Sequence, residues 1–235
     1  MNIVITGCSK GIGAELVKLL SENHNVYGLS RDLVSLEKLQ ISLSNPSNFH
    51  FIQSDITHLN KEIVNSWINV NSIDVLINNA GLLVNKPFNN ISYQDYKDVM
   101  DVNFWGAYYL SQLLLDKLSI SKGQIINISS MGGVNFSSKF SGLSLYSSSK
   151  GALTILSECL AEELKPYGIR VNALALGAVQ TEMLNKAFPG YKANISPEEM
   201  AQYIINFVNS GGNIMNGQVI KAVSYTHLRA HETDR

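Results

Sequence analysis

The chain contains little cysteine, little proline and little charge. Its 235 residues include two cysteines and five prolines, 16% are charged, and the formal net charge is -1. Cys8 and Cys159 form no spacing typical of disulfides or metal sites, so we interpret them as small apolar residues in a reducing compartment. The balanced charge lacks the basic excess usual for nucleic-acid binding. At 45% hydrophobic residues, the composition also excludes a disordered chain.

Long apolar runs are absent as well. No stretch approaches the roughly 20 apolar residues of a membrane-spanning helix, and the N-terminus lacks the basic start and apolar core of a signal peptide. We therefore expect a cytoplasmic protein without a membrane partner. The length is sufficient for one sizeable core. Because no linker, repeat or low-complexity segment interrupts the pattern, residues 1–222 are predicted to form one domain.

Short apolar runs rich in β-branched residues alternate with longer helical patterns. The predicted strands are 3–5, 26–29, 49–52, 73–77, 124–128, 170–174 and 218–221. The predicted helices are 11–22, 31–43, 61–69, 92–118, 145–165 and 197–209, with N-caps at Ser92 and Ser196 and Pro197 at a first helical position. Apolar strands alternating with helices indicate a parallel sheet covered on both faces. The expected fold is a single-domain α/β doubly wound Rossmann fold with a mostly parallel seven-stranded sheet.

The loop after the first predicted strand is rich in glycine. It reads Gly7-x-x-x-Gly11-x-Gly13 and opens a helix. Glycine permits tight turns and a close backbone approach, and the free N–H groups at a helix N-terminus attract anions. The strand–loop–helix order predicts a pyrophosphate-binding loop. The alternative is a plain glycine turn.

The end of the second predicted strand indicates which dinucleotide binds. An acidic residue there would hold the ribose hydroxyls of NAD(H) and repel a 2′-phosphate. This chain instead has Ser30 followed by Arg31, a planar cation suited to phosphate, and Lys10 adds a second cation from the first loop. These residues favour NADP(H) over NAD(H). The alternative is two solvated surface cations.

Two further loops follow the third and fourth predicted strands. Asp55 and Ile56 could hold an adenine ring by a hydrogen bond and an apolar contact, although Asp55 is equally suited to cap a helix. Asn78-Asn-Ala-Gly81 follows the fourth strand. Its amides are suited to tie the loop to neighbouring strands, and its glycine allows the backbone to approach a ligand. We expect a structural role for this segment ahead of direct chemistry.

Tyr146 and Lys150 are four residues apart in a predicted helix, and Ser130 precedes them. Positions four apart share one helix face, with Cβ atoms roughly 5–6 Å apart. A cation beside a phenol lowers the tyrosine pKa from about 10, so the pair could exchange a proton with a hydroxyl or carbonyl oxygen. Ser130 could donate a hydrogen bond to a developing oxyanion. Each feature alone has a bland alternative, a chance helix pair or a turn serine.

Five motifs occur together at suitable separations. They are Thr6-Gly7-x-x-x-Gly11-x-Gly13, Asn78-Asn-Ala-Gly81, Asn103 within Asp101-Val-Asn-Phe, Ser130, and Tyr146-x-x-x-Lys150. In this combination the chain closely resembles the short-chain dehydrogenase/reductase family, in its compact single-domain form. The resemblance covers roughly residues 2–221, and its joint motifs are far more specific than any one of them.

The resemblance implies roles for the matching residues. Tyr146 is the expected proton donor or acceptor, Lys150 lowers its pKa and binds the nicotinamide ribose, Ser130 holds the substrate oxygen, and Asn103 anchors a water that links Lys150 to solvent. Residues 182–195 are expected to form a mobile lid over the substrate. The implied cofactor-binding residues are Gly7, Ser9, Lys10, Gly11, Ile12, Gly13, Arg31, Asp55, Ile56, Asn79, Ala80, Gly81, Tyr146, Lys150, Gly177, Val179 and Thr181.

The chain departs from the family pattern in three places. Leu176-Gly177 stands where the family usually has Pro-Gly, which makes that turn less rigid. The segment between Ser130 and Tyr146 is a few residues longer than usual, and we expect it to bulge near 136–142. Residues 223–235 do not resemble the family ending, so we expect a non-native or disordered tail. Its His227 and His231 are then not expected to bind a metal.

The leading hypothesis is an NADP(H)-dependent oxidoreductase that transfers a hydride between nicotinamide and a carbonyl or alcohol substrate, with Tyr146 as the general acid/base. One alternative is a nucleotide-dependent isomerase or dehydratase, although that branch usually has a longer C-terminal domain. Another is a non-catalytic dinucleotide-binding sensor, which would be expected to lose the tyrosine, lysine or serine. The long predicted helices, 92–118 and 145–165, resemble those that build dimers and tetramers in relatives, so a homodimer or homotetramer is expected.

Overall fold

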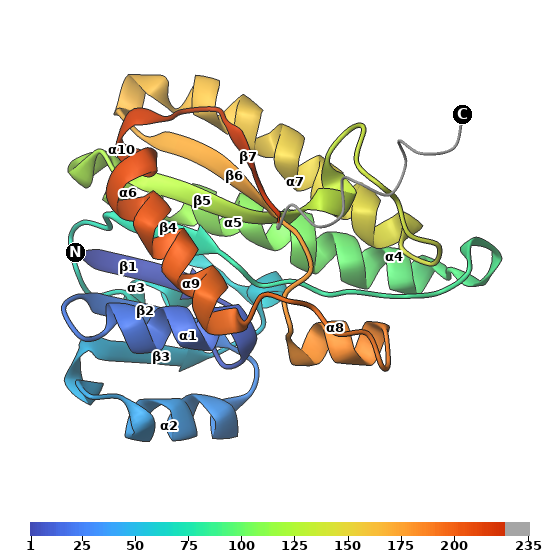
Figure 1. Cartoon of the computed structure of the whole chain (residues 1–235). Helices are drawn as coiled ribbons and strands as arrows, with labels where there is room; N and C mark the ends of the chain where they lie inside the picture. Colours follow the sequence, from blue (N-terminus) through green and yellow to red (C-terminus); the bar gives the residue numbers. More distant parts are fainter. Residues whose placement is uncertain (224–235) are drawn as a thin grey trace.

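The apolar runs of the sequence become seven strands that lie side by side in one sheet (Figure 1). The computed structural model describes residues 1–223. All neighbouring strands are parallel, in the order β3-β2-β1-β4-β5-β6-β7. The strands are β1 (Asn2–Thr6), β2 (Asn25–Ser30), β3 (Phe49–Gln53), β4 (Val75–Asn78), β5 (Gln124–Ser130), β6 (Arg170–Leu176) and β7 (Val219–Ala222). The predicted doubly wound α/β fold is confirmed, and the strand order reverses between β1 and β4.

Helices connect the strands and cover both faces of the sheet. They are α1 (Gly11–Leu20), α2 (Leu33–Ser42), α3 (Lys61–Trp67), α4 (Tyr93–Met100), α5 (Gly106–Leu113), α6 (Leu115–Ser121), α7 (Ser144–Glu163), α8 (Glu182–Ala187), α9 (Pro197–Asn206) and α10 (Gly212–Ile214). The predicted helices match these within a few residues at most ends. The short helix α8 was not predicted, and it lies within the segment expected to form the lid.

The two-residue period of the strands sorts apolar side chains onto the two faces. In β1, Ile3 and Ile5 pack in one core cluster with residues of α1, α2 and α9, whereas Val4 packs in a second cluster with residues of α3, α5, α6 and α7. Figure 1 shows α1, α2 and α9 on the near face of the sheet. Because both faces are covered, β1, β2, β4, β5 and β6 are buried at nearly every position.

Side-chain caps define where several helices begin. Ser92 and Ser196 both form capping boxes, with Asp95 and Glu199 respectively, which confirms the two predicted N-caps. The predicted helix 31–43 begins later, because Asp32 accepts a hydrogen bond from the Ser35 backbone and caps α2. By contrast, α1 has no side-chain cap and no acidic residue in its first turn among the described residues. Its first N–H groups are therefore left for another acceptor.

The predicted helix 92–118 is not continuous. Residues Asp101–Trp105 form a π-helical turn between α4 and α5, and Leu114 separates α5 from α6. A π turn widens the helix by one residue and is often found at functional sites. Asn103 is the middle residue of this turn, and its side chain is buried. The helical periodicity did not reveal this interruption, because the apolar pattern continues through it.

Two strands extend further than predicted toward the functional edge of the sheet. β5 continues to Ser130 and β6 continues to Leu176, so both residues end strands instead of lying in loops. In Figure 1 the strand arrows point to the right, toward the loops that follow them and toward α8. In doubly wound sheets, ligands bind at this carboxyl edge.

Some predictions concern residues beyond 223, and others concern membrane-spanning helices and metal sites that the sequence was not expected to contain. Apart from Val223, the expected tail falls outside the described residues, as do His227 and His231. Within residues 1–223, no helix is both long and apolar enough to cross a membrane. The same residues contain no group of three or more His, Cys, Asp or Glu side chains that could hold a metal ion.

Candidate active site

The glycine loop lies against the loop that follows β4. Gly7 has a φ of 65°, and a Cβ there would lie 2.8 Å from the Cα of Ala80. A Cβ at Gly13 would overlap the carbonyl oxygen of Gly7. Both positions therefore require glycine, because no side chain fits between the two loops. This close approach leaves the backbone of the first loop exposed toward the edge where a ligand would bind.

Hydrogen bonds from the second asparagine of the motif hold these loops together. Asn79 Nδ2 donates to the carbonyl oxygens of Thr6 (3.1 Å) and Gly7 (3.0 Å). In return, the Thr6 hydroxyl oxygen accepts from the backbone N–H groups of Asn79 (3.1 Å) and Ala80 (3.0 Å). Thr6 is fully buried, so its hydroxyl and carbonyl oxygens depend on these bonds instead of on water. The structural role predicted for this segment is confirmed.

The first asparagine of the motif connects the sheet to α7. Asn78 Nδ2 donates to Asn127 Oδ1 at 2.8 Å, and Asn127 Nδ2 donates to Ser157 Oγ at 2.8 Å. These side chains come from β4, β5 and α7 and are buried. The chain of amides therefore fixes α7 against the middle of the sheet, which positions the tyrosine and lysine at its start.

Tyr146 and Lys150 lie on α7 next to the end of β5. Lys150 Nζ donates to the carbonyl oxygen of Ile128 at 2.8 Å, and the Ser129 hydroxyl donates to the carbonyl oxygen of Lys150 at 3.0 Å. A Cβ at Gly133 would lie 2.8 Å from that same Lys150 oxygen, so the turn after β5 packs tightly on the helix. The structure thus brings Ser130, Tyr146 and Lys150 to one edge of the sheet.

Burial changes the pKa values of the two titratable groups in opposite directions. Burial raises the pKa of Tyr146, and a hydrogen bond with Ser130 acts against that increase. Burial also lowers the pKa of Lys150 to about 8, because the charged ammonium is unfavourable away from water. We expected Lys150 to lower the tyrosine pKa. In this structure that expectation is wrong, since Ser130 is the group that lowers it and the ammonium bonds to Ile128.

Asn103 joins this group through the π turn. Its Oδ1 accepts from the backbone N–H of Leu82 at 2.7 Å, and its Nδ2 donates to the Leu82 oxygen at 2.9 Å and to Ser149 Oγ at 2.9 Å. A Cβ at Gly81 would lie 3.5 Å from Lys150 Nζ and 3.6 Å from Asn103 Oδ1. Asn103 is therefore a neighbour of the lysine. We call Asn103, Ser130, Tyr146 and Lys150 the buried corner of the site, after the buried Asn103 and Lys150; Ser130 and Tyr146 are partly exposed.

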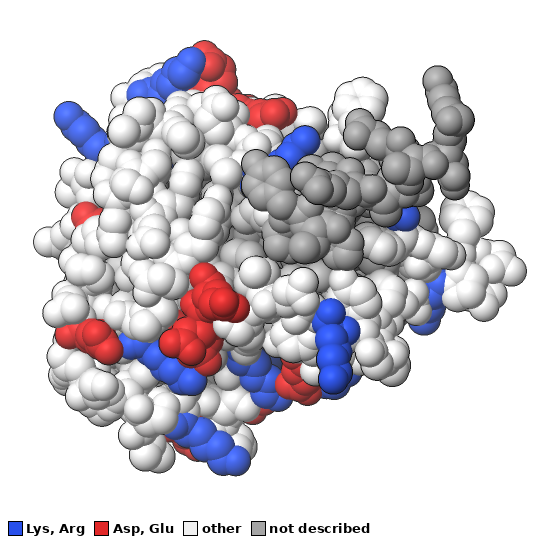
Figure 2. Space-filling view, viewed as in Figure 1, with Lys and Arg blue, Asp and Glu red and all other residues white. Residues whose placement is uncertain are grey.

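A second group of side chains gathers at the ends of β1 and β2. Lys10 Nζ lies 3.0 Å from Asp32 Oδ2, and an Arg31 nitrogen lies 3.5 Å from Asp55 Oδ2. Lys10 also lies 3.7 Å from Glu182 Oε2. We call these five residues the charged corner. The two cations expected to await a phosphate are thus both paired with carboxylates, and Figure 2 shows basic and acidic side chains side by side on the visible face.

The carboxylates of the charged corner explain the pKa values there. Hydrogen bonds from Ser35, followed by the one from Lys10, lower the pKa of Asp32 to about 2. For Asp55, partial burial raises the pKa, but hydrogen bonds from Thr57 and the charge of Arg31 outweigh it, so the pKa is lowered overall. Sequence reasoning missed Asp32 and Glu182. Asp32 had a local signal, because an Asp three residues before Ser35 is typical of a helix cap.

Asp55 and Ile56 follow β3, as predicted, and both have structural contacts. Asp55 Oδ1 accepts from the backbone N–H of Thr57 at 3.0 Å and from its hydroxyl at 2.8 Å, which confirms the capping alternative. The Ile56 side chain is buried, and a Cβ at Gly106 would lie 2.9 Å from it. It packs beneath the start of α5. The adenine contact expected of this pair stays a prediction.

The segment after β6 passes over the glycine loop. Gly177 N–H donates to the Ala222 oxygen at 2.8 Å, which fixes the turn where the family usually has Pro-Gly. Val179 forms a parallel bridge with Ile195, closing the base of the predicted lid. Thr181 caps α8, and a Cβ at Gly11 would lie 3.3 Å from its methyl carbon. The predicted cofactor residues of this segment therefore lie above the loop predicted to bind the pyrophosphate.

The far end of α8 contacts two other loops. Asn85 Nδ2 donates to the Ala187 oxygen at 2.7 Å, and the rings of Phe140 and Phe188 meet edge to face at 6.5 Å. Phe136, in the same loop as Phe140, is fully exposed with a φ of 60°. The long segment after Ser130 thus reaches outward where a bulge was predicted. Asn85 was missed because its partner is 102 residues away and no local pattern marks it.

The residues present fit a dinucleotide. The uncapped N-terminus of α1 offers N–H groups to an anion, and the glycines around it leave no room for side chains. The buried corner lies further along the same edge, at β5. A doubly wound sheet with this loop and this edge defines a nucleotide-binding α/β protein.

Comparison with known proteins identifies the family. The family model described as short chain dehydrogenase matches residues 1–192. A 3-oxoacyl-(acyl-carrier-protein) reductase FabG of Aquifex aeolicus is 30% identical, over 92% of this chain and 93% of the relative. The chain belongs to the short chain dehydrogenase family, a family of oxidoreductases.

Solved structures agree with this assignment. The structure titled ElxO with NADP bound is 28% identical, has a TM-score of 0.80, and covers 94% of this chain and 96% of its own. A 4-hydroxyisoleucine dehydrogenase complexed with NADH is 25% identical, with the same TM-score and the same coverage. The similar folds therefore include one solved with NADP and one solved with NADH.

Proposed function

We propose that this chain is an NADP(H)-dependent oxidoreductase that acts on a carbonyl or alcohol substrate, with Tyr146 as the general acid/base. The observation that carries the proposal is the buried corner. Tyr146, whose pKa Ser130 lowers against the effect of burial, lies one helical turn from the buried Lys150, at the edge where the glycine loop also ends. A sensor that only binds nucleotide needs no such group, and this favours catalysis.

The protein groups of the buried corner have separate tasks in this proposal. A substrate carbonyl oxygen accepts hydrogen bonds from Ser130 and Tyr146, and the tyrosine hydroxyl gives its proton to that oxygen as the alcohol forms. The raised pKa keeps Tyr146 protonated and ready to act as an acid at neutral pH. Asn103 holds Leu82 and Ser149 in place around Lys150, so the lysine stays beside the cleft.

A nicotinamide cofactor would supply or accept the hydride when bound. The N–H groups at the start of α1, with Ser9, Gly11 and Ile12, would bind its pyrophosphate. The backbone at Ala80 and Gly81 would border its ribose, Lys150 would bind the ribose hydroxyls, and the segment from Gly177 to Thr181 would cover its nicotinamide end.

The preference for NADP(H) rests on the charged corner. Ser30 stands where NAD(H)-binding relatives of this fold usually place an acidic residue, and it hydrogen-bonds Ser9 at 2.7 Å. Arg31 is largely exposed and paired with Asp55 only at 3.5 Å, so its guanidinium is available to a 2′-phosphate. ElxO, solved with NADP, supports this cofactor, whereas the dehydrogenase solved with NADH shows that the fold also accepts the other.

An apolar carbonyl compound is the substrate class that the lid favours. The Phe140–Phe188 pair and the partly exposed Met183 and Tyr191 belong to the segments that meet above the cleft. The relative named as a 3-oxoacyl reductase makes β-keto thioesters the first compounds to try. The test is a panel of β-keto thioesters, ketones, aldehydes and alcohols, followed by NADPH absorbance. No cofactor-dependent turnover on any class would contradict the proposal.

A homodimer or homotetramer is also proposed, together with a cytoplasmic location. Trp105 and Tyr96, on the segment from α4 to α5, and Ile155 on α7 are partly exposed, and Trp105 stacks on Tyr108 at 5.5 Å. Apolar residues exposed on neighbouring helices favour self-association. Light scattering of the wild type and of Ile155→Glu tests this, since the variant should give a smaller particle. Cell fractionation tests the location.

A further inference from the structure

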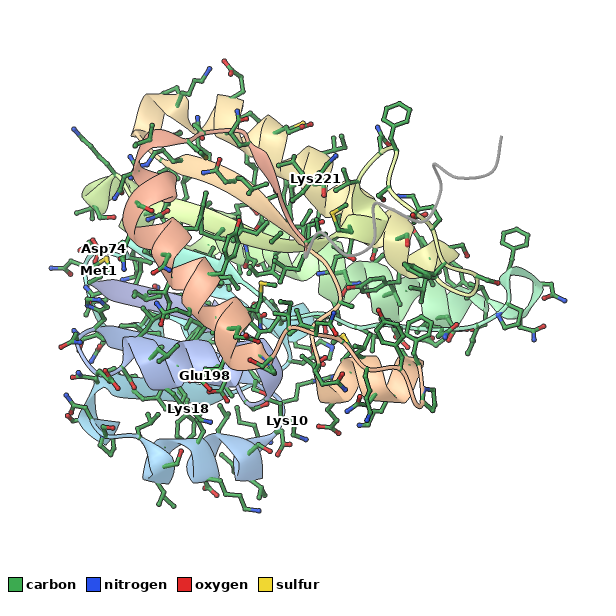
Figure 3. All side chains as sticks on the ribbon, viewed as in Figure 1. Met1, Lys10, Lys18, Asp74, Glu198 and Lys221 are labelled. Atoms are coloured by element: carbon green, nitrogen blue, oxygen red, sulfur yellow. The ribbon has the colours of Figure 1, made fainter. Side chains whose placement is uncertain are left out.

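Lys10 lies between carboxylates from two distant parts of the chain. Its Nζ is 3.0 Å from Asp32, which caps α2, and 3.7 Å from Glu182, the first residue of the lid helix α8. Figure 3 labels Lys10 near the start of α1, on the side of the molecule where α8 lies. One ammonium therefore connects the first loop, the end of β2 and the lid.

The same ammonium lies beside the place expected for an adenosine ribose. Ser9 and Ser30 hydrogen-bond each other at 2.7 Å, and Lys10 reaches Asp32 just beyond Arg31. The first loop and the end of β2 thus meet at one point. In dinucleotide-binding sheets, the residues at that point contact the ribose 2′ position. A 2′-phosphate there would come within reach of Lys10 and would also face Glu182.

We propose that Glu182 is a specificity-determining residue, because it competes with the 2′-phosphate of NADP(H) for Lys10. This inference rests on the proposed NADP(H) function. The carboxylate and the phosphate both need the same cation, and they repel each other. NAD(H) carries no 2′-phosphate and leaves the Lys10–Glu182 pair intact. Glu182 therefore weakens NADP(H) binding selectively and moderates a preference that Arg31 and Lys10 create.

The position of Glu182 extends this competition to the lid. The far end of α8 is held by Asn85, which donates to Ala187, and by the contact of Phe188 with Phe140. The near end begins at the Thr181 cap and is tied to the first loop by the Lys10–Glu182 ion pair. A 2′-phosphate that draws Lys10 away leaves Glu182 paired with Lys186 alone, at 2.7 Å within the same helix. Binding of NADP(H) then removes the Lys10–Glu182 contact at the near end of the lid, whereas binding of NAD(H) keeps it.

The first test compares dissociation constants for NADPH and NADH in the wild type and in Glu182→Gln, by nucleotide fluorescence at one fixed ionic strength. Glutamine has nearly the same helix propensity, so α8 is retained. The Kd for NADPH should fall about two- to fivefold, the size of one exposed ion pair, and the Kd for NADH should stay within error. An unchanged Kd for NADPH, or an equal gain for NADH, overturns the proposal.

Two further variants show that Lys10 is the contested group. Lys186→Gln removes the other partner of Glu182 and should not tighten NADPH binding. In a Lys10→Gln background, Glu182→Gln should give a clearly smaller gain than in the wild type, since the contested ammonium is gone. If Glu182→Gln tightens NADPH binding equally in both backgrounds, Glu182 repels the phosphate without involving Lys10. The proposed competition for Lys10 would then be wrong.

A second measurement addresses the lid directly. Hydrogen exchange in residues 182–187 should increase when saturating NADPH replaces saturating NADH, and Glu182→Gln should remove that difference. Equal exchange with both nucleotides in the wild type overturns the effect on the lid. If the wild type binds neither nucleotide, the proposed function fails with this inference. If it binds NADPH and reduces carbonyls while Glu182→Gln changes nothing, only this inference fails.

Discussion

The buried corner and the charged corner lie along one edge of the sheet but are held by different interactions. Asn103 and Lys150 are nearly inaccessible to water, and their hydrogen bonds to Leu82, Ser149 and Ile128 are 2.7–2.9 Å long. In the charged corner, Lys10 and Arg31 have side chains 54% and 68% exposed, with ion pairs of 3.0–3.7 Å.

The difference shows which part of the site is rigid and in which part a single substitution can alter binding. Breaking a buried hydrogen bond leaves an unpaired polar group away from water, which typically costs about 1–3 kcal/mol. An exposed ion pair contributes about 0–1 kcal/mol and is screened by salt. The chemistry is therefore held in a rigid corner, whereas cofactor choice depends on a corner where one substitution shifts the balance.

Tyr146→Phe should reduce kcat by about 10²–10⁴-fold, because it removes only the hydroxyl that exchanges the proton. NADPH binding should remain close to that of the wild type, since the ring is kept. Steady-state kinetics on any substrate found in the panel, with NADPH titration, measures both. Tyr167→Phe, at a half-exposed tyrosine after α7, is the matched control and should keep full activity. Near-full activity of Tyr146→Phe would show that another group transfers the proton.

Lys150→Met should lower activity yet stabilise the fold at neutral pH. The pKa of Lys150 falls from 10.5 to about 8 on folding, so the buried ammonium destabilises the native state below pH 8. Removing it should raise the free energy of unfolding by about 1–3 kcal/mol at pH 7. The advantage should shrink between pH 8 and 10.5, where the native lysine loses its proton first. Urea unfolding at several pH values measures this, and a variant less stable than the wild type at pH 7 would contradict it.

The same substitution can be made at a buried threonine near the glycine loop and at a partly exposed threonine beside the charged corner. Thr6→Val removes a buried hydroxyl oxygen that accepts from Asn79 and Ala80, and it should lower the free energy of unfolding by about 2–4 kcal/mol. Thr57→Val, beside Asp55 in the charged corner, removes one partly exposed hydroxyl bond and should cost less than about 1 kcal/mol. Chemical denaturation measures the free energy of unfolding of both variants, and equal losses would contradict the contrast between buried and exposed hydrogen bonds.

Arg31→Asp should change cofactor choice with little effect on stability. An acidic residue at the end of β2 repels a 2′-phosphate and accepts from a ribose hydroxyl. The ratio of kcat/KM for NADPH over NADH should fall about 10- to 100-fold, or 1.4 to 2.8 kcal/mol. Lys38→Asp, the same charge change at an exposed position of α2, should alter the ratio far less. An unaltered ratio in Arg31→Asp would contradict the assignment of this corner to phosphate.

Much of the fold was predictable from local patterns. The period-two strands, the glycine loop and the caps at Ser92 and Ser196 depend on residues within a few positions of each other. The pairing of Tyr146 with Lys150 on one helix face was predictable for the same reason. The π turn at Asn103 was not, because the apolar pattern continues through it and only packing against Leu82 and Ser149 distinguishes it.

The electrostatic state of the site was less accessible to sequence reasoning. From the sequence, Lys10 and Arg31 were interpreted as partners for phosphate. Their carboxylate partners lie further along the chain: for Lys10, Asp32 is 22 residues away and Glu182 is 172 residues away, and for Arg31, Asp55 is 24 residues away. The pKa of Tyr146 was predicted in the wrong direction for a similar reason. Helical spacing places a lysine near the phenol, but it does not report burial, which dominates both groups here.

By itself, the sequence determined the elements of this protein, the glycine loop and the residue types of the buried corner. Those features follow from backbone preferences and short spacings, which act within one strand or one helical turn. Only the tertiary structure decided which charges are neutralised, which hydroxyl acts on Tyr146, and where α8 is held. These outcomes depend on contacts between segments up to 172 residues apart, and on the removal of water that folding alone brings about.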